Sequence, residues 1–355
     1  MSGFERNTAF ATLLLSLLLP VAVAAAPVNQ LVNHPSPYLA LHGSDPVAWQ
    51  EWNAATIARA KRKNKLLFVS VGYFACHWCH VMQRESYKNA QIAALLNRDF
   101  IPVKVDRELN SGLDDALQTF SAQLNGVAGW PLNAFVTPEG FPAFVVLYAP
   151  PDDFRKLLSH LAERWAADPA GIRRLARQAA PPPAQPPDRA PLTAARTARA
   201  ADVLDEPRYR EIARGTLGFM QDELLDPGGG LYSSTSAVDA AGREGAAYLW
   251  EPDELKRRLP PEAFAAARRV WRLDAPRSFD HGYLPAEYRT PTADERRLLA
   301  TAVRILRPVR QARSLPKDDK LNASLNGLAL SAFTVEPFNS IRPTVCTPTA
   351  CSNSC

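Results

Sequence analysis

Two cysteines three residues apart form the strongest chemical motif of this sequence, Cys76-His77-Trp78-Cys79. They follow Leu66–Val71, an uncharged run of the kind found in strands that are buried on both faces. From Cys76 onward the apolar spacing is helical, so the free N–H groups at the start of a helix can stabilise a thiolate there. We therefore expect a catalytic redox dithiol, in which Cys76 attacks or is attacked in a mixed disulfide and Cys79 resolves it. His77 and Trp78, which lie between the sulfurs, are expected to modulate this exchange.

Three other chemistries fit the same residues. The pair could be an inert structural disulfide. C-x-x-C-H is also the attachment motif of c-type haem, with His80 as the axial ligand. Zinc could be bound by Cys76, Cys79, His77 and His80, although neighbouring ligands on one helical turn cannot all point at one ion. The position of the motif after a strand favours the redox dithiol, and we expect no cofactor and no metal.

A second candidate element is Gly129-Trp130-Pro131, just before the apolar run 133–136. Thioredoxin-type sites place a cis proline here, facing the dithiol, so that the preceding backbone can pair with a substrate peptide. Trp130 and Pro131 are therefore the expected substrate-binding residues; an ordinary turn proline is the alternative. The strand region 66–74 carries no carboxylate that could accept a proton from Cys79, which leaves Glu85 or water for that role.

The elements that must position these residues can be read from the periodicity. Strands are expected at 66–71, 100–105, 133–136 and 143–148, and helices at 76–96, 113–124 and 152–166. The turn signal Thr137-Pro-Glu-Gly140 pairs the last two strands antiparallel. The order β-α-β-α-β-β-α, with the cysteine motif at the first strand-to-helix junction, predicts a thioredoxin-like α/β fold.

Composition and the N-terminus bound the functional class. The chain has 355 residues, 46% hydrophobic and 22% charged, with a net charge of +5 that is spread out, so nucleic acid is not an expected partner. The apolar run Ala11–Ala26 after a short charged start is typical of a secretory signal peptide, here 1–26, with an uncleaved anchor as the alternative. We expect a periplasmic or secreted protein with no stable membrane span after cleavage. In such a compartment the five cysteines, an odd number, cannot all pair internally.

The remaining chain divides by composition. Six of the thirteen residues in 179–191 are proline, which indicates an extended spacer, and we place a Pro-rich linker at 171–203 between a thioredoxin-like domain at 27–170 and a helical region at 204–333. Helices are expected at 208–224, 251–259, 261–273, 293–306 and 321–333. The segment 334–355 has no periodicity and holds Cys346, Cys351 and Cys355.

These motifs resemble a known family. Ser36-Pro-Tyr-Leu39, Cys76-His-Trp-Cys-His-Val-Met82 and Gly129-Trp-Pro-Leu-Asn133 occur in the order seen in the spermatogenesis-associated, thioredoxin-domain (YyaL-type) family. The resemblance is strong over 29–148 and implies a thioredoxin-like domain followed by a six-hairpin-glycosidase-like α/α toroid. The toroid part is incomplete: the acidic stretch of the family appears here as Thr235-Ser-Ala-Val238, and the resemblance stops near Phe333. The tail 334–355 has the character of a shifted reading frame or a truncation.

The sequence thus predicts an exported thiol–disulfide oxidoreductase-like protein, with protein thiols or disulfides as substrates and a separate partner that recycles the dithiol. One alternative is a carbohydrate-binding or carbohydrate-processing protein that acts through the toroid region, although glycoside hydrolysis needs two placed carboxylates. A second alternative is a non-enzymatic binding module in which the cysteine pair is only a structural disulfide.

Overall fold

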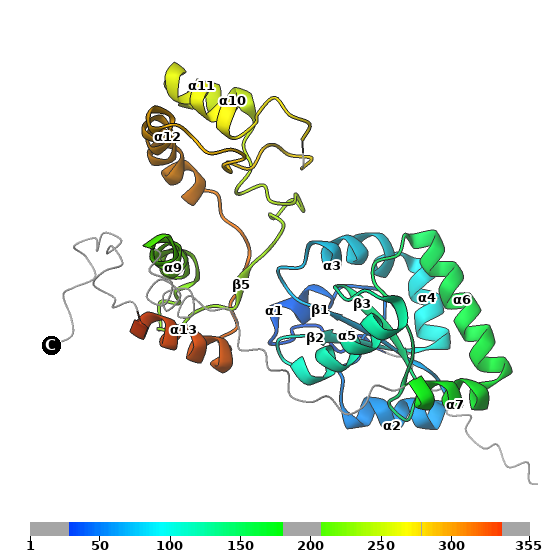
Figure 1. Ribbon diagram of the computed structural model, residues 1–355. Helices are drawn as coiled ribbons and strands as arrows, with labels where there is room; N and C mark the ends of the chain where they lie inside the picture. Colours follow the sequence, from blue (N-terminus) through cyan, green and yellow to red (C-terminus); the bar gives the residue numbers. More distant parts are fainter. Residues whose placement is uncertain (1–27, 180–206, 278, 336–355) are drawn as a thin grey trace, which may run out of the picture.

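The structure, a computed structural model, describes residues 28–179, 207–277 and 279–335. The expected signal peptide, most of the expected linker and the tail from 336 lie outside these residues. Figure 1 shows an α/β part that runs to residue 179 and a second, largely helical part that begins at residue 207.

A four-stranded mixed sheet forms the centre of the α/β part. Its strands are β1 (Leu67–Gly72), β2 (Ile101–Asp106), β3 (Leu132–Val136) and β4 (Pro142–Val146), in the order β2-β1-β3-β4. Strands β1 and β2 are parallel, whereas β3 runs antiparallel to β1 and β4 runs antiparallel to β3. The antiparallel β3–β4 pairing predicted from the turn is confirmed.

Helices cover both faces of this sheet (Figure 1), and their bounds follow the chain. They are α1 (Pro37–Leu41), α2 (Ala54–Lys63), α3 (His77–Met82), the π-helical turn η1 (Gln83–Tyr87), α4 (Ala90–Asp99), α5 (Ser111–Asn125), α6 (Pro151–Ala167) and α7 (Pro169–Ala179). The sequence predicts one helix over 76–96, but the chain forms α3, η1 and α4 instead. The reason is Asn89, whose side chain accepts hydrogen bonds from the N–H groups of Gln91 and Ile92 and so starts a new helix. The expected linker range, 171–203, begins inside α7.

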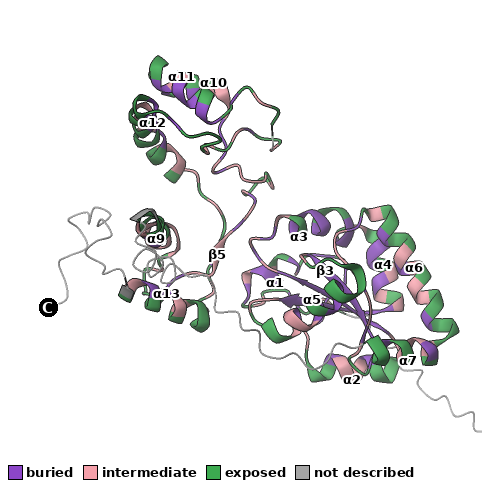
Figure 2. Cartoon of the chain, in the orientation of Figure 1, coloured by how far each residue is buried: buried purple, intermediate pink, exposed green. Residues whose placement is uncertain are grey.

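The alternation of side chains along β1 separates two apolar cores. Leu67, Val69 and Val71 lie in the core on one face, which includes Phe120 of α5. Phe68 lies in the core on the other face, together with the two cysteines and the large rings of Tyr38 and Trp49. All six residues of β1 are buried, as expected for a strand covered on both sides, and Figure 2 shows the same burial across the sheet.

The second part consists mainly of helices: α9 (Pro207–Phe219), the π-helical turn η2 (Met220–Leu224), α10 (Pro252–Arg258), α11 (Pro261–Val270), α12 (Ala293–Gln311) and α13 (Ala323–Val335). A short antiparallel pair, β5 (Ser234–Thr235) and β6 (Lys317–Asp318), joins distant segments. Helices α10, α11 and α12 enclose a core that includes Trp250, Leu255 and Leu299. The predicted fold class, a thioredoxin-like α/β part followed by a helical region, is confirmed.

Candidate functional site

A disulfide joins Cys76 and Cys79 at the junction of β1 and α3, with the Cα atoms 5.3 Å apart. Cys76 is the N-cap of α3, and its sulfur accepts a hydrogen bond from the backbone N–H of Cys79 at 3.2 Å. The strand ends at Gly72, and a tight turn follows in which the Cys76 N–H donates to the carbonyl oxygen of Tyr73. The chain therefore places both sulfurs beyond the end of the central strand of the sheet.

The two sulfurs differ in their surroundings. Cys76 is 5% exposed and Cys79 is 1% exposed, which is the order that attack on the first and resolution by the second requires. Trp78, between them, is half exposed, and its ring lies 4.9 Å from that of Tyr148. His80 is buried and its Nε2 lies 2.8 Å from the carbonyl oxygen of Phe74; burial lowers the pKa of this imidazole. Of these side chains Trp78 is the most exposed, and Cys76 is more exposed than Cys79.

The buried face of β1 below the disulfide carries small residues. Ser70 and Gly72 share the face of Phe68 because side chains alternate along a strand. A Cβ atom added at Gly72 would lie 2.1 Å from the hydroxyl oxygen of Tyr38 and 2.7 Å from the sulfur of Cys79. The Tyr38 hydroxyl and the Cys79 sulfur therefore both lie where a Gly72 side chain would begin. The distance between these two atoms is at most the sum of the two distances above.

A buried lysine lies one pleat further along this face. Lys104 is paired with Ser70 in the β1–β2 register, and its ammonium donates a hydrogen bond to the Ser70 hydroxyl at 2.8 Å. The Ser70 oxygen is also 2.9 Å from the hydroxyl of Tyr87, which in turn donates to Asn133 at 2.7 Å. Burial lowers the pKa of Lys104 to about 7, partly offset by the charge of Asp45. This face of the core therefore carries a buried lysine beside Ser70, and the buried carboxylate of Asp106 lies beside Gly72 in the same register.

Asp45 organises the polar side chains at the far side of this core. Its carboxylate oxygen lies 2.7 Å from Nδ1 of His42 and accepts a bond from the indole N–H of Trp49 at 3.0 Å. Gln83 of η1 donates to the other carboxylate oxygen. Burial raises the pKa of Asp45, but these hydrogen bonds outweigh it and leave the pKa below its usual value. Burial, with the charge of Lys104, lowers the pKa of His42 to about 4, so this imidazole is neutral above that pH.

The second predicted element has the expected backbone: the Trp130–Pro131 peptide bond is cis. Trp130 donates from its indole N–H to the buried Asp114 at 2.8 Å, and the guanidinium of Arg107 lies 4.0 Å above its ring. The ring of Tyr73, from the turn that leads into Cys76, meets Trp130 edge-on at 5.5 Å. The structure thus brings the loop before β3 into contact with the cysteine loop through Tyr73 and Trp130.

Residues of the second part reach the α/β part at two places. The ammonium of Lys320 lies 2.8 Å from the carboxylate of Asp106, at the end of β2, and 3.0 Å from that of Glu108. Burial lowers the pKa of Lys320, but the bonds to Asp106 and Asp318 outweigh it and raise the pKa above its usual range. Nearer to the disulfide, Glu244 lies 3.5 Å from Nε2 of His77.

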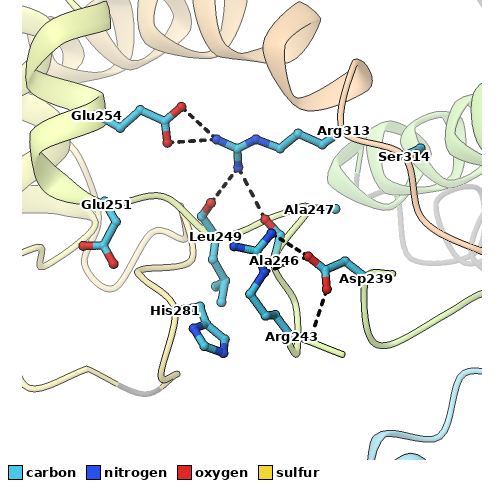
Figure 3. Close-up of a pocket in the computed structure, with 10 residues that line it drawn as sticks. All are labelled: Asp239, Arg243, Ala246, Ala247, Leu249, Glu251, Glu254, His281, Arg313 and Ser314. Carbon is cyan, nitrogen blue, oxygen red and sulfur yellow. Dashed lines mark hydrogen bonds and ion pairs between the residues drawn. The ribbon is translucent and has the colours of Figure 1, made fainter. Parts of the chain in front are cut away.

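A separate pocket of about 440 Å³ lies in the second part (Figure 3). Arg313 donates two bonds of 2.9 Å to Glu254 and one to the carbonyl oxygen of Leu249. Asp239 is paired with Arg243, and Glu251 with Arg277. Hydrolysis of a glycoside needs one carboxylic acid and one carboxylate that are free to act, whereas these carboxylates are each held by an arginine. The pocket therefore gives no support to glycoside hydrolysis, one form of the carbohydrate alternative.

No group of three or more His, Cys, Asp or Glu side chains within the described residues is arranged to hold a metal ion. No described helix has both the length and the apolar character needed to cross a membrane.

Sequence reasoning missed the residues that surround Cys79. Tyr38 belongs to the Ser36-Pro-Tyr-Leu39 motif, but its place in that motif gives no hint that it meets Cys79. Lys104 could have been found, because it occupies an inward position in a strand whose other residues, apart from Asp106, are apolar. Glu85, one of the two groups left as proton acceptor, is exposed and accepts a hydrogen bond from Tyr148, so it is not beside the buried sulfur.

Residues 28–181 match a family model named Thioredox_DsbH and described as "Protein of unknown function, DUF255". Spermatogenesis-associated protein 20 of Mus musculus is 42% identical over 144 residues, which are 39% of this chain and 18% of that protein. An uncharacterised protein of Caenorhabditis elegans is 42% identical over 130 residues, 37% of this chain and 18% of that protein. The matched segment therefore spans less than a fifth of these relatives, and the resemblance read from the motifs is confirmed over the α/β part.

Among solved structures, one described as DsbH oxidoreductase is similar to 33% of this chain, over 85% of its own length, with 18% identity and a TM-score of 0.27. A thioredoxin from Thermus thermophilus is similar to 35% of this chain, over 94% of its own length, with 19% identity and a TM-score of 0.28.

Proposed function

We propose that this protein is an exported thiol–disulfide oxidoreductase whose working group is the Cys76–Cys79 pair. The observation that carries the proposal is the disulfide itself, which lies at the end of the central strand with Cys76 more exposed than Cys79. An inert structural disulfide does not need this asymmetry, and it does not need an exposed tryptophan between its two cysteines.

The proposed exchange has two steps. A substrate thiolate attacks the sulfur of Cys76, the Cys76–Cys79 bond breaks, and its electron pair stays on the Cys79 sulfur. A second substrate thiolate then attacks the mixed disulfide at the substrate sulfur, and Cys76 leaves as a thiolate. Two electrons pass from the substrate dithiol to the protein; in the reverse direction Cys79 attacks Cys76 in the mixed disulfide and releases the substrate thiolate.

Trp130 and Pro131 would bind the substrate chain beside Cys76. The proposed contact is with the backbone that precedes the cis proline, because an extended peptide can pair with an exposed backbone edge. The ring of Trp130 is fixed by Asp114, Arg107 and Tyr73, so the edge is held in place before a substrate arrives. His77 and Trp78 would modulate the equilibrium by their position between the sulfurs.

The test is a thiol–disulfide equilibrium of the full chain. Cys346, Cys351 and Cys355 are first replaced by serine, so that only two sulfurs titrate. The protein is equilibrated in glutathione buffers, alkylated and weighed by mass spectrometry. We expect a reversible two-electron transition between about −270 and −120 mV, the range of thioredoxin-fold oxidoreductases. If the pair stays oxidised at every glutathione potential, it is a structural disulfide and the proposal is refuted.

The roles of the two cysteines can be separated by trapping. In Cys79→Ser the Cys76 thiolate attacks a substrate disulfide, one substrate sulfur leaves as a thiolate, and the mixed disulfide should accumulate because the resolving sulfur is absent; the matched Cys76→Ser variant should accumulate little. Equal trapping by both variants would contradict the assignment of Cys76 as the attacking sulfur. Export is tested separately, by fractionating cells and sequencing the N-terminus of the mature chain, which we expect to begin near Pro27.

A further inference from the structure

The hydroxyl of Tyr38 is buried without a partner. Tyr38 is 0% exposed, and no group of the described residues accepts or donates a hydrogen bond at its oxygen. An unpaired buried hydroxyl costs on the order of 1 to 3 kcal/mol, so most buried polar groups are hydrogen-bonded. An unpaired hydroxyl of this kind is explained if its hydrogen-bond partner forms only in another redox state of the protein.

The neighbour of this hydroxyl is the sulfur that changes state. The oxygen of Tyr38 and the sulfur of Cys79 both lie around the empty Cβ position of Gly72, at 2.1 and 2.7 Å from it. In the disulfide the Cys79 sulfur is bonded to Cys76 and carries no charge. When the disulfide is reduced, the same sulfur becomes a thiol or thiolate, which accepts hydrogen bonds.

The ring of Tyr38 is held firmly in this position. Ser36 caps α1 by accepting the N–H of Leu39, and its hydroxyl also bonds to the carboxylate of Asp106 at 2.7 Å. The ring of His42 meets the Tyr38 ring edge-on at 5.3 Å. A hydroxyl fixed in this way does not have to be ordered when the thiolate appears, so little entropy is lost on forming the bond.

Tyr38 keeps its proton and so stays able to donate. Burial raises the pKa of its phenol well above the usual value, and Tyr87, Asp106, Asp45 and Tyr73 raise it further. The proton therefore stays on the oxygen throughout the exchange. The Lys104 ammonium donates to Ser70 and lies 5.3 Å from the centre of the Tyr38 ring, over its face and not at its hydroxyl.

We propose that the Tyr38 hydroxyl donates a hydrogen bond to the sulfur of Cys79 when the Cys76–Cys79 disulfide is reduced, and that it thereby stabilises the leaving thiolate. This inference rests on the proposed function and assigns the group that supports the resolving sulfur. In the first step of the exchange the electron pair of the broken S–S bond stays on the sulfur of Cys79. The O–H of Tyr38 then donates a hydrogen bond to this thiolate and keeps its proton. In the reverse step the hydrogen bond from Tyr38 to Cys79 breaks as the Cys79 sulfur attacks Cys76. Gly72 is required because any side chain there would separate the two groups.

The test compares Tyr38→Phe with the parent in the glutathione equilibrium, using the full chain without the three C-terminal cysteines. Phenylalanine fills the same space, so the oxidised protein should unfold at the same or a higher urea concentration. The reduced form loses a hydrogen bond, so the constant for oxidation by glutathione should rise about tenfold, which is a potential more negative by about 30 mV. The shift should be larger at about pH 9 than at neutral pH, because the thiolate is the better acceptor.

The matched control is Tyr87→Phe, which removes another fully buried hydroxyl from the same core. That hydroxyl is bonded to Ser70 and Asn133, so its loss should lower stability and leave the glutathione constant within about twofold of the parent. The inference is overturned if the parent exchanges reversibly and Tyr38→Phe keeps the same constant, or if both variants shift it equally. A parent that does not exchange at all would overturn the proposed function, and this inference with it.

Discussion

The buried lysine of β2 should make the stability of this protein depend on pH in a specific window. The pKa of Lys104 is lowered from 10.5 to about 7 in the folded chain by burial. Between these two values the unfolded chain holds a proton on this side chain and the folded chain does not. Stability rises with pH wherever the unfolded state binds more protons, so the free energy of unfolding should increase from pH 7 upward.

The magnitude follows from the same two values. In the middle of the window one pH unit is worth about 1.4 kcal/mol for a single group, so about 2 to 3 kcal/mol should be gained between about pH 7 and pH 9. Below pH 7 Lys104 is protonated in both states and contributes no slope. Near pH 10 the tyrosines of the unfolded chain ionise, whereas burial raises the pKa of Tyr87 well above its usual value in the folded chain, and the slope reverses.

The assay is urea denaturation followed by tryptophan fluorescence at several pH values, for the parent and Lys104→Met. Methionine has a similar length and no charge, so the variant should lose the slope and be at least as stable as the parent at about pH 6. The control is Lys61→Met, at an exposed position in α2, which should keep the slope of the parent. If Lys104→Met and the parent rise equally between pH 7 and pH 9, Lys104 is charged in the folded core and the reasoning fails.

Three further changes test other contacts. Gly72→Ala should lower stability by about 1 to 3 kcal/mol, because the new methyl group meets the Tyr38 hydroxyl and the Cys79 sulfur, and Tyr38→Phe in the same chain should recover part of the loss in urea titrations. Lys320→Met should cost about 3 to 5 kcal/mol, because it leaves buried carboxylates without a counter-charge; a loss below about 1 kcal/mol would show that the ion pairs are solvated. Glu244→Gln should change the glutathione constant by less than about fivefold and lose its effect in 1 M salt, because both partners of the His77 contact are partly exposed.

The sheet and the cysteine pair could be predicted from sequence because both depend on local patterns. The uncharged run before Cys76 and the turn at Thr137–Gly140 each determine an element with few alternatives. The division of the helix after Cys76 depends on one asparagine cap, which periodicity does not detect. The surroundings of Cys79 could not be predicted, because Tyr38 approaches it from α1, far from Cys79 in the sequence, and is brought there only by tertiary packing.

The ion pairs of Lys320 connect the second part of the chain to the strand beside the disulfide. Asp106 is the register partner of Gly72, so the docked lysine neutralises charge one strand away from the reacting sulfurs. Reduction adds negative charge at those sulfurs; the ammonium of Lys320 favours that charge, and the carboxylates of Asp106, Glu108 and Asp318 oppose it. Such coupling is reciprocal: whatever the docked lysine contributes to the stability of the dithiol, the dithiol contributes equally to the docking. The redox state of the pair and the attachment of the second part therefore form one thermodynamic cycle. A reduction potential measured on an isolated α/β fragment would lack the charges of the second part and would differ from that of the full chain.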